Sequence, residues 1–189
     1  MDKTDKRVAR SIRLIKNSFF QLLKEKDIEK ISVVEICELA GISRYTFYTH
    51  YEDINALRRE LEEEAAHLVI DNFESYRFDK NAMHIIDGLL HALKENPDHF
   101  ALWLSNPLSD SGSISIIYDY VYQQVIPVWK QHSNLGEAEI RLLIRYVMSG
   151  TFAILQSWQF DNFAMEETII RELMENVIKN GVYHYIYIK

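Results

Sequence analysis

The sequence predicts an all-α protein with a small N-terminal helical domain followed by a larger helical domain. The 189 residues include only 6 Gly and 3 Pro, so residues that favour turns are scarce. Apolar residues recur at spacings of three and four rather than two, which is typical of amphipathic helices. The hydrophobic fraction of 48% is large enough to form a buried core. We therefore expect helices throughout.

Charge is distributed unevenly between the two predicted domains. The whole chain has a net charge of -7. Residues 1–50 contain ten Lys and Arg against seven Asp and Glu, whereas residues 51–189 contain eleven against twenty-one. Such asymmetry predicts different partners for the two domains. Nucleic-acid binding needs cations that neutralise phosphates, so the N-terminal domain is the candidate for it.

The first predicted domain, residues 1–52, begins with an amphipathic helix over about residues 6–26. Its apolar positions follow the helical period: Val8, Ile12, Ile15, Phe19 and Leu22. The basic side chains Lys6, Arg7 and Arg10 lie near its start. They are either a solvated helix face or a surface for phosphates.

Two short helices follow, and their spacing predicts a helix-turn-helix. Ser32 and Glu35 have the spacing of a capping box that opens the second helix. Gly41 suits the end of that helix, and Ser43 can cap a third helix that includes Phe47 on its inner face. Helices joined by about three residues including a glycine must cross steeply.

The second predicted domain, residues 53–189, begins with a long helix from Asp53 to about Tyr76, which should join the two domains. Turn-like segments separate the helices expected after it. These helices are predicted at about residues 80–95, 97–105, 113–131, 135–159 and 166–186.

The segment KISVVEICELAGISRYTFYTHYEDINAL resembles the DNA-binding domain of the tetracycline-repressor (TetR) family, and the match spans about residues 6–60. The most specific part of the match is Ile36, Cys37, Ala40, Gly41, Ile42, Ser43, Thr46, Phe47, Tyr48, His50 and Tyr51. The resemblance implies a homodimeric transcriptional regulator, a repressor that binds a twofold-symmetric operator. It also implies release of the DNA through an all-helical regulatory domain.

The resemblance implies that the third helix lies in the major groove. The residues expected on DNA are Ser43, Arg44, Tyr45, Thr46, Tyr48, Thr49 and His50, with Lys6, Arg7 and Arg10 on phosphates. Arg44 can pair with guanine O6 and N7. Tyr48 can instead pack within the domain, and His50 can instead cap the helix end.

Two departures from the family pattern stand out. Many members have a lysine just before the fourth helix, where this chain has Ile54 preceded by Glu52 and Asp53. Val33 and Val34 occupy positions of the second helix where polar residues often bind phosphate. The phosphate contacts must then come more from the third helix and from the basic arm, the segment at the start of the first helix that contains Lys6, Arg7 and Arg10.

A dimer interface is expected on the last two long helices, as in the TetR family, with an intramolecular core as the alternative. The candidate interface residues are Leu143, Val147, Gly150, Ala153, Ile154, Trp158, Ile170, Leu173 and Val177. Aromatic residues in the middle of the domain either line an apolar pocket for a small apolar or aromatic effector or form plain core. These are Phe100, Trp103, Tyr118, Tyr122 and Trp129.

The sequence agrees less well with a metal-binding protein or an enzyme. The single cysteine, Cys37, provides neither an intrachain disulfide nor a structural zinc site, and no cofactor or metal is expected. Glu64 and His67 form one Glu-x-x-His without the second pair that a carboxylate-bridged metal site needs, which favours a solvated helix face and argues against an enzyme.

We expect a cytoplasmic protein without a membrane partner, because the sequence has neither a signal peptide nor about 18 consecutive apolar residues. The alternative to a DNA-binding regulator is a helical adaptor of the same fold that acts through a protein partner.

Overall fold

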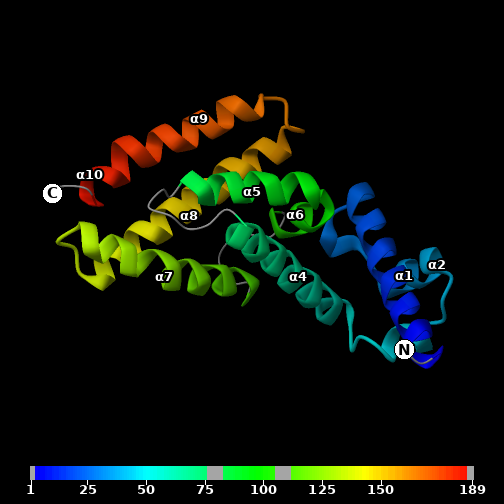
Figure 1. The fold of residues 1–189 in the computed structure, drawn as a ribbon. Coiled ribbons are helices and arrows are strands. Elements are labelled where there is room, and N and C mark those ends of the chain that lie inside the picture. Colours follow the sequence, from blue (N-terminus) through cyan, green and yellow to red (C-terminus); the bar gives the residue numbers. More distant parts are fainter. Residues whose placement is uncertain (1–2, 76–82, 105–111, 187–189) are drawn as a thin grey trace. The chain divides into compact units, whose positions relative to one another are not determined.

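The computed structural model describes residues 3–75, 83–104 and 112–186, and every regular element in these ranges is a helix (Figure 1). The predicted all-α class is therefore confirmed. The chain divides into two compact units, Met1–Glu62 and Glu63–Lys189. Helix α4 (Ile54–Ser75) contains the point of division.

The first unit contains α1 (Lys3–Glu25), the short 3-10 helix η1 (Ile28–Lys30), α2 (Val33–Ala40), α3 (Arg44–Tyr48) and the beginning of α4. Helix α1 packs against α2, and α2 packs against α3. The largest fully buried side chains of this unit are Ile15, Phe19, Ile36, Phe47, Leu57 and Leu61. Most of this core was expected from the helical period of the first three helices.

The first turns of α4 belong to the N-terminal unit, so the unit ends later than the predicted boundary after residue 52. Leu57 and Leu61 are fully buried. Lys16 Nζ of α1 lies 2.6 Å from Glu60 Oε1 of α4. Helix α4 therefore begins inside the core of this unit.

The second unit is built from the rest of α4 and the helices that follow it. These are α5 (Met83–Glu95), α6 (Pro97–Leu104), α7 (Gly112–His132), α8 (Glu137–Phe160), α9 (Glu167–Val177), the π-helical turn η2 (Ile178–Val182) and α10 (Tyr183–Ile186). The predicted helix over 166–186 is thus divided by a π-helical turn. Helix α8 contacts α6 and α7, and α9 contacts α5 (Figure 1).

Short connections position the helices of this unit. Gly136 N donates to Glu139 Oε2 at 2.7 Å, which caps the start of α8. After α8 the backbone of Asn162 and Phe163 has positive φ, and Trp158 Nε1 donates to Met165 O across the turn at 2.8 Å. Arg171 Nε of α9 donates to Asp87 Oδ1 of α5 at 2.7 Å. These contacts hold α9 in a defined position within its unit.

The described ranges contain neither a membrane-spanning helix nor a cluster of potential metal ligands. None of the described helices combines the length and hydropathy that crossing a membrane would require. No group of three or more His, Cys, Asp or Glu side chains is placed to hold a metal ion there. His67 is exposed, and the Glu64 side chain keeps 42% of its surface accessible, with its Oε2 atom 3.7 Å from His99 Nε2.

Candidate nucleic-acid interface

The second helix is held at its start by the predicted capping box. Ser32 Oγ accepts a hydrogen bond from Glu35 N at 3.4 Å, and Glu35 Oε2 accepts one from Ser32 N at 3.1 Å. Lys26, just after α1, also donates to the Glu35 carboxylate. The hydrogen bonds from Lys26 and Ser32 lower the pKa of Glu35 to about 2. The start of α2 is therefore tied to the end of α1.

The turn between α2 and α3 has the geometry that the sequence predicts. Gly41 has a φ of 65°, in the left-handed region that glycine adopts without strain. Ile42 N donates to Cys37 O at 3.0 Å, which satisfies a carbonyl at the end of α2. Ser43 Oγ then accepts from Thr46 N at 3.1 Å and caps α3. A helix-turn-helix results.

The inner face of α3 anchors it in the unit. The Phe47 side chain is fully buried, and its ring centroid lies 5.7 Å from that of Tyr51. Tyr51 Oη in turn donates to Glu60 Oε1 of α4 at 3.3 Å. Because one face of α3 is held in this way, the remaining faces point away from the core.

The outward side chains of α3 are available to a partner. Arg44 is exposed, and Tyr45 keeps 81% of its surface accessible. Tyr48 keeps 55% of its surface accessible, and its ring packs edge-to-face with that of Phe47, with the two ring centroids 5.5 Å apart. Both alternatives for Tyr48 are therefore compatible, since its ring packs and its outer part remains free to bind.

The hydroxyl groups near α3 are partly engaged in the helix. Thr49 Oγ1 donates to Tyr45 O at 2.9 Å and to Thr46 O at 2.8 Å, so its single hydroxyl hydrogen is already used. Ser43 Oγ and Thr46 Oγ1 share a hydrogen bond of 2.9 Å. Thr49 could thus donate to a phosphate only by giving up its bonds to the backbone. His50 is half-buried at the end of the helix.

The predicted basic arm lies on α1, which is a different element from α3. Lys6, Arg7 and Arg10 are all exposed in the first turns of α1. At the start of α4, Asp53 Oδ1 accepts a hydrogen bond from Ala56 N at 2.7 Å. The sequence predicts that the long helix starts at Asp53, but the capping role of its side chain was not predicted, although an aspartate directly before a helix is the ordinary signal of a cap.

Comparisons with known sequences and structures identify proteins with this architecture. No family model matches the chain. A TetR transcriptional regulator from Streptococcus agalactiae 2603V is 24% identical, with a TM-score of 0.62 over 97% of this chain and 95% of that one. A putative tetR family transcription regulator from Shewanella sp. PV-4 is 15% identical, with a TM-score of 0.64 over 90% and 96%. The chain has the TetR fold.

A curated relative agrees with this fold. The uncharacterized HTH-type transcriptional regulator YxbF of Bacillus subtilis (strain 168) is 25% identical over 177 residues. The match covers 89% of this chain but 45% of YxbF, so the chain spans about half the length of that relative. The predicted resemblance to TetR-type regulators is confirmed at the level of fold, with α2 and α3 as the helix-turn-helix.

The residues predicted for a dimer interface divide into two groups in this TetR fold. Trp158 and Ile170 are buried in the core of their own unit. The others line the surface of α8 and α9, either half-buried or exposed: Leu143, Val147, Gly150, Ala153, Ile154, Leu173 and Val177. Only this second group can contact another molecule without repacking the core.

The residues predicted for an effector pocket do not line one common cavity in the described part of the chain. Phe100 and Trp129 are buried in the core cluster, and the Trp103 side chain lies outside the described residues. Tyr118 and Tyr122 are half-buried, and their rings stack at 5.8 Å on α7. Tyr122 lines a cavity between α7 and α8 that Phe100, Tyr118 and Trp129 do not line.

Proposed function

We propose that this protein is a DNA-binding transcriptional regulator that acts as a repressor and binds a twofold-symmetric operator as a homodimer. The observation that supports this most strongly is the form of α3. The helix is capped by Ser43 and anchored by buried Phe47, and it presents exposed Arg44 and Tyr45 to solvent. A short helix held in this way can enter the major groove with its first residues at the base edges.

The side chains then have distinct roles. Arg44 at the first turn of α3 pairs with a guanine through its two guanidinium donors. Lys6, Arg7 and Arg10 neutralise phosphates and contribute affinity without sequence preference. Because this chain has Ile54 where many TetR-family members have a lysine, these N-terminal cations supply a larger share of the phosphate contacts.

The dimer is supported by apolar surface on the second unit. Tyr146 of α8 keeps 66% of its surface accessible, and Leu173 and Val177 of α9 keep 48% and 47%. Gly150 and Ala153 are exposed on α8, where small side chains allow another helix to approach closely. Two copies that cover this surface would place two α3 helices on one DNA duplex, as a twofold-symmetric operator requires.

The function is tested by selecting binding sites from a pool of random duplex DNA and titrating the winning sequence at several salt concentrations. Arg44→Ala should weaken binding to the selected site by about 1–3 kcal/mol and relax the preference at one base pair. Arg10→Ala should weaken binding to all DNA sequences by the same factor and reduce the dependence of affinity on salt concentration.

Two outcomes would contradict the proposal. If the wild-type protein enriches no sequence and binds no duplex at low salt, the adaptor that acts through a protein partner becomes the better description. If Arg44→Ala weakens selected and unselected DNA equally, Arg44 contacts phosphate and does not read bases. Circular dichroism of each variant establishes that the helices remain folded.

A further inference from the structure

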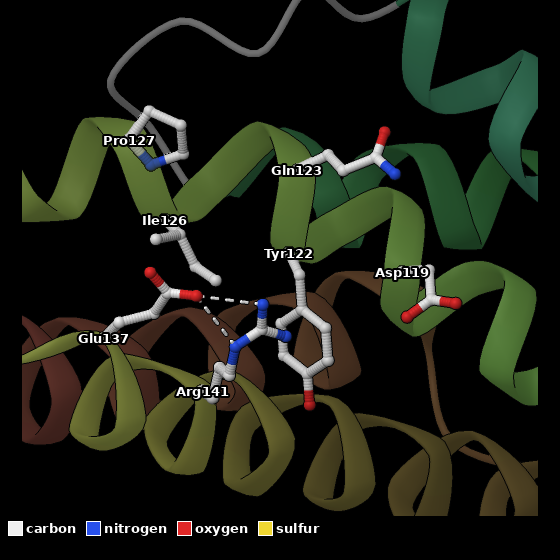
Figure 2. Close-up of a pocket in the computed structure, with 7 residues that line it drawn as sticks. All are labelled: Asp119, Tyr122, Gln123, Ile126, Pro127, Glu137 and Arg141. Atoms are coloured by element: carbon white, nitrogen blue, oxygen red, sulfur yellow. Dashed lines mark hydrogen bonds and ion pairs between the residues drawn. The ribbon is translucent and has the colours of Figure 1, made fainter.

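The second unit contains a cavity of about 280 Å³ between α7 and α8 (Figure 2). Helix α7 contributes Asp119, Tyr122, Ile126 and Pro127 to its lining. Helix α8 contributes Glu137 and Arg141 from its first two turns. The volume is just below the usual range for small-molecule sites, and the lining combines an aromatic ring, apolar groups and charges.

The positive charge in this cavity is already balanced within the protein. The Glu137 Oε1 atom accepts hydrogen bonds from Arg141 Nε at 3.2 Å and Nη2 at 3.0 Å, and Oε2 accepts one from Lys130 Nζ at 2.8 Å. These hydrogen bonds lower the pKa of Glu137, and the bond from Lys130 has the largest effect. The Arg141 guanidinium also lies 4.6 Å from the centroid of the Tyr122 ring. Figure 2 shows the guanidinium between the ring and the carboxylate.

The remaining charged side chain in the lining is negative, while Arg145, a cation outside the lining, lies 5.6 Å from the centroid of the Tyr118 ring. Asp119 is exposed and lies one turn before Tyr122 on the same side of α7 (Figure 2). In the described part of the chain, no hydrogen bond or ion pair involves its carboxylate. The neighbouring Tyr122 ring attracts cations through its face, as its contact with Arg141 demonstrates. Asp119 and Tyr122 therefore provide a carboxylate and an aromatic surface side by side.

We propose that this cavity binds a small organic cation, an amine on a flat apolar body. The ammonium group pairs with Asp119, and the apolar body lies against Tyr122, Ile126 and Pro127. The excess of acidic residues in the C-terminal part of the chain, eleven Lys and Arg against twenty-one Asp and Glu over residues 51–189, adds long-range attraction for a cation. The sequence predicts an apolar or aromatic effector, and this proposal adds a positive charge to it.

Calorimetric titration of the full-length protein with three ligands of similar shape tests the charge preference. Phenethylammonium should bind, whereas 2-phenylethanol and 3-phenylpropionate should bind at least about tenfold more weakly, because only the amine forms a charge-assisted hydrogen bond. The measurement contains no DNA, so its result is independent of the proposed DNA-binding function. Failure of the amine to bind, or equal binding of the three ligands, would overturn the proposal.

Two variants test the residues. Asp119→Asn should weaken amine binding at least about tenfold, while Asp161→Asn, an exposed change just after α8, should leave it unchanged. Arg141→Gln should strengthen amine binding, because it frees the face of Tyr122 and the Glu137 carboxylate. An unchanged affinity in Asp119→Asn, or weaker binding in Arg141→Gln, would show that the amine does not occupy this site.

Discussion

The Glu35 carboxylate connects the end of α1 to the start of α2. It accepts hydrogen bonds from Lys26 after α1 and from the Ser32 backbone at the start of α2. Its pKa is lowered from 4.5 to about 2 by these partners, so the folded state favours the ionised form. A lowered pKa in the folded state stabilises the protein fully above the unfolded pKa. This contribution is lost as the pH falls toward the folded pKa.

Glu35→Gln should therefore reduce the free energy of unfolding at neutral pH, and the difference from the wild type should shrink as the pH falls from about 5 to about 2. Denaturant titrations at a series of pH values measure this difference. Glu38→Gln, an exposed change on the same helix, is the matched control and should have little effect. A difference that stayed constant over this pH range would assign the role of Glu35 to packing instead of charge.

At the scale of single elements, the turn between α2 and α3 sets how the two helices cross. No heavy atom beyond the local backbone lies within 4 Å of the place where a Cβ of residue 41 would stand. The glycine is therefore required by its φ of 65° and not by lack of space. An L-residue other than Asn or Asp adopts this conformation only with strain.

Gly41→Ala should destabilise the N-terminal unit by about 1–2 kcal/mol, and Gly41→Asn by less. Thermal unfolding followed by circular dichroism measures both changes. Gly150→Ala provides a contrast, since Gly150 lies inside α8 with equally open surroundings and a normal helical φ. In a monomeric state that change should be neutral or stabilising. Equal stability of Gly41→Ala and the wild type would mean that the turn can form without a left-handed residue.

The elements with strong local signals were predictable. The capping box at Ser32, the left-handed Gly41 and the cap at Ser43 depend on residues within one turn of each other, and the structure contains all three. The π-helical turn η2 was not predicted, because α9 and α10 on either side have the same helical period. The helical period of one sequence does not reveal the single extra residue that a π-helical turn contains.

The buried face of α8 shows a second limit of the sequence. The helical period predicts one apolar stripe on this helix, made of Ile140, Leu143, Val147, Thr151, Ile154 and Trp158. The structure buries Ile140, Thr151 and Trp158 of this stripe and leaves the other three half-buried. It also buries Ile144, Met148, Phe152 and Leu155, which lie beside the stripe. Because α8 has apolar residues around most of its circumference, periodicity cannot select one face. Tertiary packing decides which face is covered.

At the scale of the whole molecule, α8 and α9 use one face for their own unit and leave another apolar face uncovered. Ile170 and Met174 of α9 are buried, whereas Ile169, Leu173 and Val177 keep about half of their surface accessible. Between α8 and α9 lies a hollow of about 100 Å³, lined by residues that include Gly150 and Val177. Contiguous apolar surface of this kind is typical of an interface between proteins.

The dimer proposed for DNA binding should therefore use this surface. Sedimentation at micromolar concentration should give about twice the chain mass of 22.3 kDa. Gly150→Arg should convert the dimer to a folded monomer, because position 150 has open surroundings within one chain but a bulky charge there would obstruct a second copy. Gln124→Arg, at an exposed position of α7, is the matched control and should remain dimeric.

The same variant connects assembly to DNA binding. A monomer offers one α3 helix to a duplex, so Gly150→Arg should bind a single half-site as the wild-type chain does but lose the added affinity for two half-sites spaced one helical turn apart. Titration of DNA with one and with two half-sites measures the two affinities. A wild-type monomer at micromolar concentration, or a Gly150→Arg protein that stays dimeric, would place the interface elsewhere or remove it. Loss of half-site binding in a folded monomer would mean that α3 needs a second copy even to engage one major groove.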